Sequence, residues 1–191
     1  LETLTSEAVP QPRRNAVART LQELMFRELF EFRFVQTDPN IANYLYVPGT
    51  QQLALLDLGS VGEYPAAFVD GYRRICRGVL ADDTDAIRDA IFDLGYGHPD
   101  DPREMVDNAI DIMRLVCEPF AHRGIYDFAA SGLIARARNR GIEAAFGHGL
   151  RAPPPETMFL HRKLIGTFLI CTRLHARINV HALIEPYLQA R

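Results

Sequence analysis

The sequence predicts a mainly α-helical fold of one domain, with one small β-hairpin in its N-terminal third. The 191 residues are 48% hydrophobic and 24% charged, a composition typical of a globular domain with one sizeable core. Apolar residues recur at helical spacing through most of the chain. One short stretch instead holds two β-type runs on either side of a Pro-Gly turn.

The apolar periodicity predicts a series of helices joined by short loops. Residues 1–12 lack periodicity and predict a loop, after which a first helix is expected from about Arg13 to Phe34. Phe26, Phe30 and Phe34 widen its apolar face and are expected in the core. After Gly59 the chain is expected to be helical to its end, over about residues 65–79, 83–94, 102–119, 129–146, 156–178 and 180–188. Asp101 is expected to cap the helix that follows it.

The exception to this helical pattern is the predicted hairpin. Asn43 to Val47 is aromatic and β-branched and predicts a strand, and Pro48 to Gln51 is a turn signal. Leu53 to Leu56 is a short apolar run, which predicts a second, buried strand. Asp57 then ends this strand, where its charge would need a cation or hydrogen bonds to compensate for burial.

Three side chains on this stretch form the candidate site: Asp38, Asn43 and Asp57. Asn43 follows Asp38 by five residues, and 13 residues separate it from Asp57, which precedes Leu58-Gly59. A kinase-type phosphotransfer site uses this order, with an Asp that orients the attacking hydroxyl and an Asn and a second Asp that bind the metal. Mg²⁺ prefers such hard oxygen ligands. We therefore predict Asp38 as the catalytic residue and Asn43 and Asp57 as the metal ligands.

Two simpler interpretations of the same residues stay open. In the first, Asp38 and Asn40 build an Asx turn and Asp57 ends a strand, and none of them has a catalytic role. Alternatively, Asp38 and Asp57 could serve a Mg²⁺-dependent hydrolase that uses no nucleotide. If the kinase-type interpretation holds, the hairpin should bring the oxygens of Asn43 and Asp57 within about 8 Å of each other, with Asp38 beside them.

Composition and charge exclude several other classes of function. The net charge of −3, with scattered basic residues, gives no reason to expect a nucleic-acid partner. The longest uncharged apolar run, Leu164 to Cys171, has eight residues and is too short to span a bilayer. Three widely spaced cysteines in helical patterns predict reduced core residues, and no histidine has a partner at metal-ligand spacing.

One further count concerns the phosphate-binding groups. The chain has a single lysine, Lys163, far in sequence from the candidate site, and no Gly-rich loop or Lys-bearing strand precedes Asp38. A kinase takes both from an N-terminal lobe. We therefore expect residues 1–191 to be half of a kinase-like site, cut from a longer chain since it begins at Leu1 without Met, and unable to turn over ATP alone.

Longer stretches carry a resemblance to a known family. They read R-E-L-F-E-F-R-F-V-Q-T-D-P-N-I-A-N-Y-L-Y, L-L-D-L-G-S-V-G-E-Y and P-P-P-E-T-M-F-L-H-R-K-L-I-G-T-F-L-I-C-T-R-L. Over roughly residues 12–188 the chain resembles the UbiB/AarF-domain atypical kinases, most closely their coenzyme Q biosynthesis branch. The resemblance implies a protein-kinase-like C-terminal lobe, with Asp38 as the catalytic-loop Asp and Asn43 and Asp57 as metal ligands.

The resemblance also implies a biochemical setting. The family binds ATP with Mg²⁺ and has ATPase-type activity that supports coenzyme Q assembly. Its members lie peripherally at a membrane, on the matrix face of the mitochondrial inner membrane or in the bacterial cytoplasm. Partners would be the nucleotide and possible coenzyme Q biosynthesis proteins or lipid. The alternative is a catalytically silent, pseudokinase-like helical module that binds a protein or lipid partner.

Two departures from ordinary kinases bear on regulation. The usual D-F-G reads Asp57-Leu58-Gly59, where Leu can pack in place of Phe but a Phe-dependent switch is in doubt. Gln36-Thr37 stands where ordinary kinases have His-Arg. Without that Arg, a phosphorylated activation loop has no cation on which to dock, and the short segment from Gly59 to Pro65 leaves no room for a long one.

Overall fold

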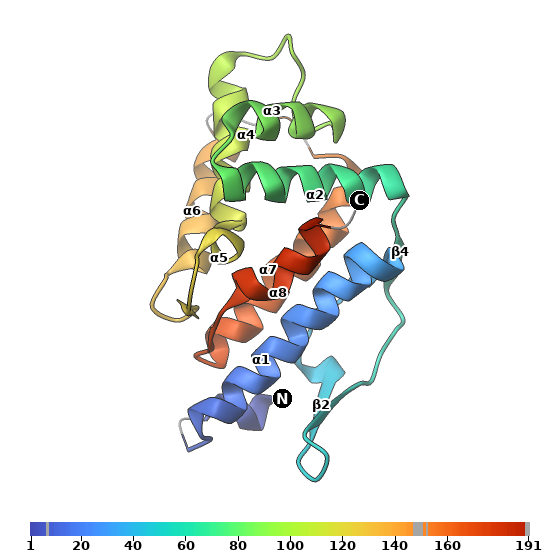
Figure 1. Ribbon diagram of the computed structural model, residues 1–191, viewed down its shortest axis with the longest axis vertical. Coiled ribbons are helices and arrows are strands. Elements are labelled where there is room, and N and C mark those ends of the chain that lie inside the picture. The colour runs from blue at the N-terminus through green and yellow to red at the C-terminus, as the bar shows by residue number, and fades with distance from the viewer. Residues whose placement is uncertain (7, 147–150, 152, 190–191) are drawn as a thin grey trace.

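The computed structural model describes residues 1–6, 8–146, 151 and 153–189. In Figure 1, α1 (Gln11–Phe26), α7 (Pro155–Arg173) and α8 (Val180–Gln189) lie side by side, and α2 (Ala66–Ala81) crosses them at one end. A pair formed by α4 (Arg103–Val116) and α6 (Leu133–Phe146) flanks one side of this layer. The hairpin lies on the opposite side, beside α1.

The remaining elements are short. The helical ones are η1 (Glu2–Thr5), the π-helical turn η2 (Arg27–Phe32), η3 (Ile41–Asn43), α3 (Thr84–Asp93) and α5 (Glu118–Ala121). The strands are β1 (Phe34–Gln36), β2 (Tyr44–Val47), β3 (Gln52–Leu55), β4 (Val61–Glu63), β5 (Tyr126–Asp127) and β6 (Arg177–Ile178). The expected mainly helical class is confirmed.

The strands form three separate antiparallel pairs rather than the single hairpin that we expected. The expected hairpin is present, with Tyr44 opposite Leu55 and Val47 opposite Gln52. A second pair joins β1 to β4, with Gln36 opposite Val61, and a third joins β5 to β6. The prediction of unbroken helical structure after Gly59 is therefore wrong, because long-range pairing recruits segments too short to show their own periodicity.

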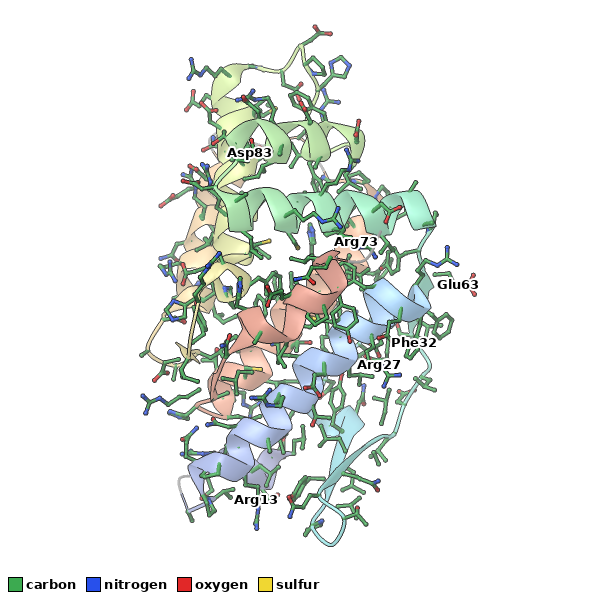
Figure 2. All side chains as sticks on the ribbon, viewed as in Figure 1. Arg13, Arg27, Phe32, Glu63, Arg73 and Asp83 are labelled. Carbon is green, nitrogen blue, oxygen red and sulfur yellow. The ribbon has the colours of Figure 1, made fainter. Side chains whose placement is uncertain are left out.

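The first helix differs from the prediction at both ends. It begins at Gln11 and passes at Arg27 into the π-helical turn, which ends at Arg33 in a left-handed conformation with φ of 55°. Phe26 is buried as expected, but Phe34 is exposed because the turn at Arg33 directs the chain into β1. Phe32 is 53% exposed and lies near Glu63, at the edge of the molecule where β4 runs (Figure 2).

Three other boundaries are set by local backbone geometry. The helix expected from Ala129 begins at Leu133, because Asp127 Oδ1 accepts hydrogen bonds from the backbone N–H groups of Ala129 and Ala130. The helix expected to reach Ile178 ends at Arg173, two residues before His175 turns left-handed. The cap expected from Asp101 is wrong, since Pro102 is the N-cap residue and no side chain caps that helix.

The core is continuous and apolar, and it includes all three cysteines. Cys76, Cys117 and Cys171 are buried and reduced, as expected. The apolar faces of α1, α2, α4, α7 and α8 all contribute to the same core cluster. α7 packs against α1. Arg162, Lys163 and Gly166 of α7 contact the end of β1 and the loop that follows it, and these contacts help to place the candidate site.

Candidate functional site

Asp38 and Asn43 contact each other directly. The Asn43 side-chain nitrogen donates a hydrogen bond of 3.0 Å to Asp38 Oδ2 and another of 3.2 Å to the Asp38 backbone oxygen. The η3 turn makes this possible because Asn40 Oδ1 accepts from the Ala42 N–H and caps the turn. The structure therefore brings together two of the three predicted site residues, and the Asn43 amide oxygen is the atom that could ligate a metal.

A backbone hydrogen bond at the base of the hairpin places Asp57 next to Asn43. The Leu56 N–H donates to the Asn43 carbonyl at 2.8 Å, so Asp57 is the next residue beyond a pair that extends the β2–β3 ladder. Asp57 Oδ1 accepts a 2.6 Å hydrogen bond from the Gly59 N–H. A Cβ at Gly59 would lie 2.9 Å from the same oxygen, so a larger residue here would require the Asp57 carboxylate to shift.

The environment of Asp57 corrects one expectation. The strand before it was expected to be buried and to reach Leu56, but it ends at Leu55, its residues are at most half-buried, and Leu56 is exposed. Asp57 itself is exposed, and so is Leu58, the residue in the place of the D-F-G Phe, at 61%. Burial therefore does not require a compensating cation at Asp57.

The β1–β4 pair closes the site from the other side, a feature that the sequence did not indicate. The Thr37 N–H donates to the Ser60 carbonyl at 2.9 Å, and the Thr37 and Ser60 hydroxyls are 2.7 Å apart. These contacts hold the segment before Asp38 against the segment after Gly59. The two acidic loops are thus joined by two separate strand pairs, one on each side of Asn43.

A buried polar cluster supports the Asp38 loop from behind, and its centre is Lys163 on α7. Lys163 Nζ lies 2.9 Å from Glu28 Oε2 and donates to Gln36 Oε1 at 3.3 Å and to the Tyr44 hydroxyl at 3.2 Å. Gln36 in turn donates through Nε2 to the Asp38 carbonyl at 2.7 Å. The only lysine of the chain therefore positions the candidate catalytic loop from the protein interior.

The electrostatics of this cluster are those of a buried ion pair. Burial raises the pKa of Glu28, and the nearby Lys163 ammonium offsets part of that rise. Burial also raises the pKa of Tyr44, so its hydroxyl stays protonated. Buried charges are costly unless they are paired, so the loss of either Lys163 or Glu28 alone would leave the other charge buried without its partner.

Two more residues of α7 contact the same loop. Gly166 packs on Pro39, and a Cβ at position 166 would lie 2.6 Å from Pro39 Cβ, so only glycine allows this approach. Arg162 Nη2 forms an ion pair of 2.6 Å with Asp38 Oδ1. Sequence reasoning assigned no role to either residue, although both lie within the L-H-R-K-L-I-G segment that carries the family resemblance.

The donor atoms suit Mg²⁺ bound together with a nucleotide. Within the described ranges, no group of three His, Cys, Asp or Glu side chains could hold an ion. One amide oxygen from Asn43 and one carboxylate from Asp57 are the one or two protein ligands that Mg²⁺ commonly takes when phosphates supply others. The role of Asn43 and Asp57 as metal ligands stays a prediction.

The histidine next to Arg162, His161, is held by two tyrosine hydroxyls. His161 Nε2 lies 2.9 Å from the Tyr72 hydroxyl and 2.8 Å from the Tyr96 hydroxyl. Burial lowers the pKa of His161 to about 4, so the ring is neutral at pH 7.

The helical body and its small strand pairs are those of a kinase-like fold. The solved structure of Rv3197 with erythromycin, from Mycobacterium tuberculosis, superposes with a TM-score of 0.74 at 18% identity. The match covers 92% of this chain and 44% of that one. At this identity the likeness shows the fold alone.

Sequence comparison then gives the family. Residues 2–91 match the ABC1 atypical kinase-like domain. The mitochondrial atypical kinase COQ8B of Rattus norvegicus is 38% identical over 179 residues, 94% of this chain and 34% of the relative. The mitochondrial atypical kinase COQ8 of Schizosaccharomyces pombe is 32% identical over 188 residues, 97% of this chain and 31% of the relative. The chain is a homologue of these atypical kinases, and the predicted resemblance to UbiB/AarF proteins is confirmed.

Two further findings concern the extent of the match and the hydropathy of the helices. The chain spans about a third of the length of the curated relatives that it matches. In the part of the chain that the structure describes, no helix is long and apolar enough to cross a bilayer.

Proposed function

We propose that residues 1–191 form the C-terminal lobe of an atypical kinase-like ATPase or phosphotransferase that binds Mg-ATP. Asp38 orients the attacking hydroxyl or water, and Asn43 and Asp57 hold Mg²⁺. The observation that carries the proposal is the contact between Asn43 and Asp38, with Asp57 next to Asn43 across the base of the hairpin. The matches to ABC1-type atypical kinases support it.

The role proposed for each residue follows from its contacts. The Asn43 amide nitrogen fixes one Asp38 oxygen, which leaves its amide oxygen for the metal. The Gly59 N–H orients the Asp57 carboxylate. When bound, Mg²⁺ would neutralise phosphate charge and align the phosphates. The lysine that pairs with the nucleotide would come from an N-terminal lobe outside residues 1–191, and we therefore expect these residues alone to be inactive.

The wider role follows from kinship. The relatives carry the names of mitochondrial atypical kinases. We infer that the full protein supports coenzyme Q biosynthesis, lies peripherally at a membrane on the mitochondrial matrix face or in a bacterial cytoplasm, and contacts biosynthesis proteins or lipid. The alternative is a silent, pseudokinase-like module that binds a protein or lipid. A cavity of about 250 Å³ with an almost wholly apolar lining, between α1, α2, α4 and α7, is the observation that favours an apolar ligand in that case.

The test of the proposed function is Asp57→Asn in the full-length protein. Asn keeps the shape and removes the charge that holds the metal, so the Mg²⁺-dependent part of the ATP-induced thermal shift should disappear. Asp100→Asn is the matched control, because Asp100 is 90% exposed on a distant loop and its loss removes the same charge. An unchanged Mg²⁺-dependent shift in Asp57→Asn would favour the silent module.

A further inference from the structure

The candidate site lacks a cation in its own sequence. From Gln36 to Tyr64 the chain contains Asp38, Asp57 and Glu63 but no lysine or arginine. A phosphoryl group in transfer spreads negative charge over three oxygens, and two carboxylates beside it would repel that charge. A side-chain cation that acts beside Mg²⁺ on the transferred group would therefore come from another element.

Arg162 on α7 lies where that cation is needed. Among the described residues, it is the cation in ion-pair contact with Asp38, with Nη2 2.6 Å from Oδ1. This contact occupies one nitrogen of a guanidinium that has five N–H groups, and the side chain is 56% exposed. The planar fork therefore has N–H groups within reach of a phosphate placed at Asp38, and arginine suits bidentate phosphate binding.

The backbone beneath Arg162 is fixed while its side chain is not. The next residue, Lys163, is buried in the Glu28 ion pair, and Gly166 one turn later packs on Pro39. Both contacts hold α7 against the Asp38 loop. An ion pair as exposed as that of Arg162 and Asp38 adds little stability, so stability alone does not account for an arginine at this position.

We propose that Arg162 contacts the γ-phosphate of bound ATP and stabilises the charge of the transferred phosphoryl group. In the structure its guanidinium contacts Asp38. With ATP bound, its guanidinium moves to the phosphate oxygens and frees Asp38 Oδ1 for the attacking hydroxyl or water. This inference rests on the proposed function, in which Asp38 orients the nucleophile.

The step balances without another reactant. The bond from the γ-phosphorus to the β,γ-bridging oxygen breaks, and its electron pair leaves with ADP. A bond forms from the oxygen of water, or of an acceptor hydroxyl, to the γ-phosphorus. The proton of that oxygen passes to Asp38 and then to solvent, while Arg162 keeps its protons throughout.

The test compares ATP with ADP in the full-length protein with Mg²⁺. Arg162→Ala should lower kcat by a factor of about 10³ or more, the size of effect of a lost arginine finger. It should weaken ATP binding by about tenfold and leave the Kd for ADP within about twofold, because only ATP carries the γ-phosphate. Arg162→Lys should restore only part of kcat, since a point charge cannot make the bidentate contact.

The matched control is Arg173→Ala, an exposed arginine 11 positions further along α7, about 16 Å away. It should leave kcat and both Kd values unchanged. Equal losses of ATP and ADP binding in folded Arg162→Ala would overturn the inference, as would unchanged kcat. If Arg162→Ala does not fold, Arg162→Lys decides: a kcat equal to that of the wild type would then overturn the inference. If the wild-type protein binds no Mg-nucleotide, the proposed function fails first, and the two failures are thereby distinguished.

Discussion

The two acidic residues of the candidate site are held in different ways. Arg162 of α7 forms an ion pair with Asp38. The loop of Asp38 is supported by the cluster around the buried Lys163 and by the packing of Gly166 on Pro39. Asp57 follows a two-stranded hairpin, and its carboxylate contacts the N–H of Gly59, two residues away. The Asp38 half of the candidate site is therefore supported by the helical body, while the Asp57 half rests on local backbone geometry.

The largest expected effect comes from breaking the support of Asp38 at Lys163. Lys163→Met leaves the Glu28 carboxylate buried without its partner and should lower the free energy of unfolding by about 3–5 kcal/mol. Chemical denaturation measures this. The double variant Lys163→Met with Glu28→Met removes both charges, and it should recover most of the loss. A double variant as unstable as the single one would contradict the ion-pair account.

The same variant has a predictable pH dependence. The folded-state pKa of Glu28 is raised by burial, so ionised Glu28 disfavours folding. Without the Lys163 ammonium the pKa rises further. Stability should therefore be highest below the unfolded pKa of about 4.5 and fall as pH rises through the folded pKa. Lys163→Met should lose more stability at pH 8 than at pH 5, whereas the double variant should show no such loss.

An intermediate effect is expected at Gly166. In an open helix, Gly→Ala stabilises by about 0.5–1 kcal/mol. At position 166 the added methyl group collides with Pro39, so Gly166→Ala should instead destabilise by about 1–3 kcal/mol. Gly141→Ala in α6 is the matched control, because nothing lies within 4 Å of its Cβ position, and it should stabilise. Thermal unfolding of both variants should give shifts of opposite sign.

The smallest effect is expected on the other half of the site. Asp57 is exposed, so Asp57→Asn should change the free energy of unfolding by no more than about 0.5 kcal/mol. Denaturant titration without nucleotide checks this value. A loss comparable to that of Lys163→Met would show that Asp57 is also part of the folded framework, and the contrast between the two halves would be lost.

The local half of the site was predictable and the distant half was not. The order Asp38, Asn43, Asp57 and the strands around Pro48 could be read from spacing, and the structure places all three residues on adjacent loops. The contact of Arg162 with Asp38 joins residues 124 positions apart. Helical periodicity shows which face of a helix is apolar, but not which loop a polar face meets.

The errors have a similar origin. Phe34 fits a helical face, yet the left-handed backbone at Arg33 turns it outward. An apolar run predicts a buried strand only if other elements cover both of its faces, and β3, the strand before Asp57, is at most half-buried. The burial of Lys163 could not be predicted, because no pattern within one helix indicates that a lysine packs against Glu28 from another.

The burial of that lysine also makes it a natural chemical reporter. Since Lys163 is the only lysine among the 191 residues and is 1% exposed, its ε-amine is shielded from acylating reagents while the fold is closed. The rate at which it acquires a label then measures how often the packing behind Asp38 opens. Opening of the candidate catalytic loop thus becomes a mass measurement at the one ε-amine of residues 1–191, distinguished from the α-amine of Leu1, without an introduced probe.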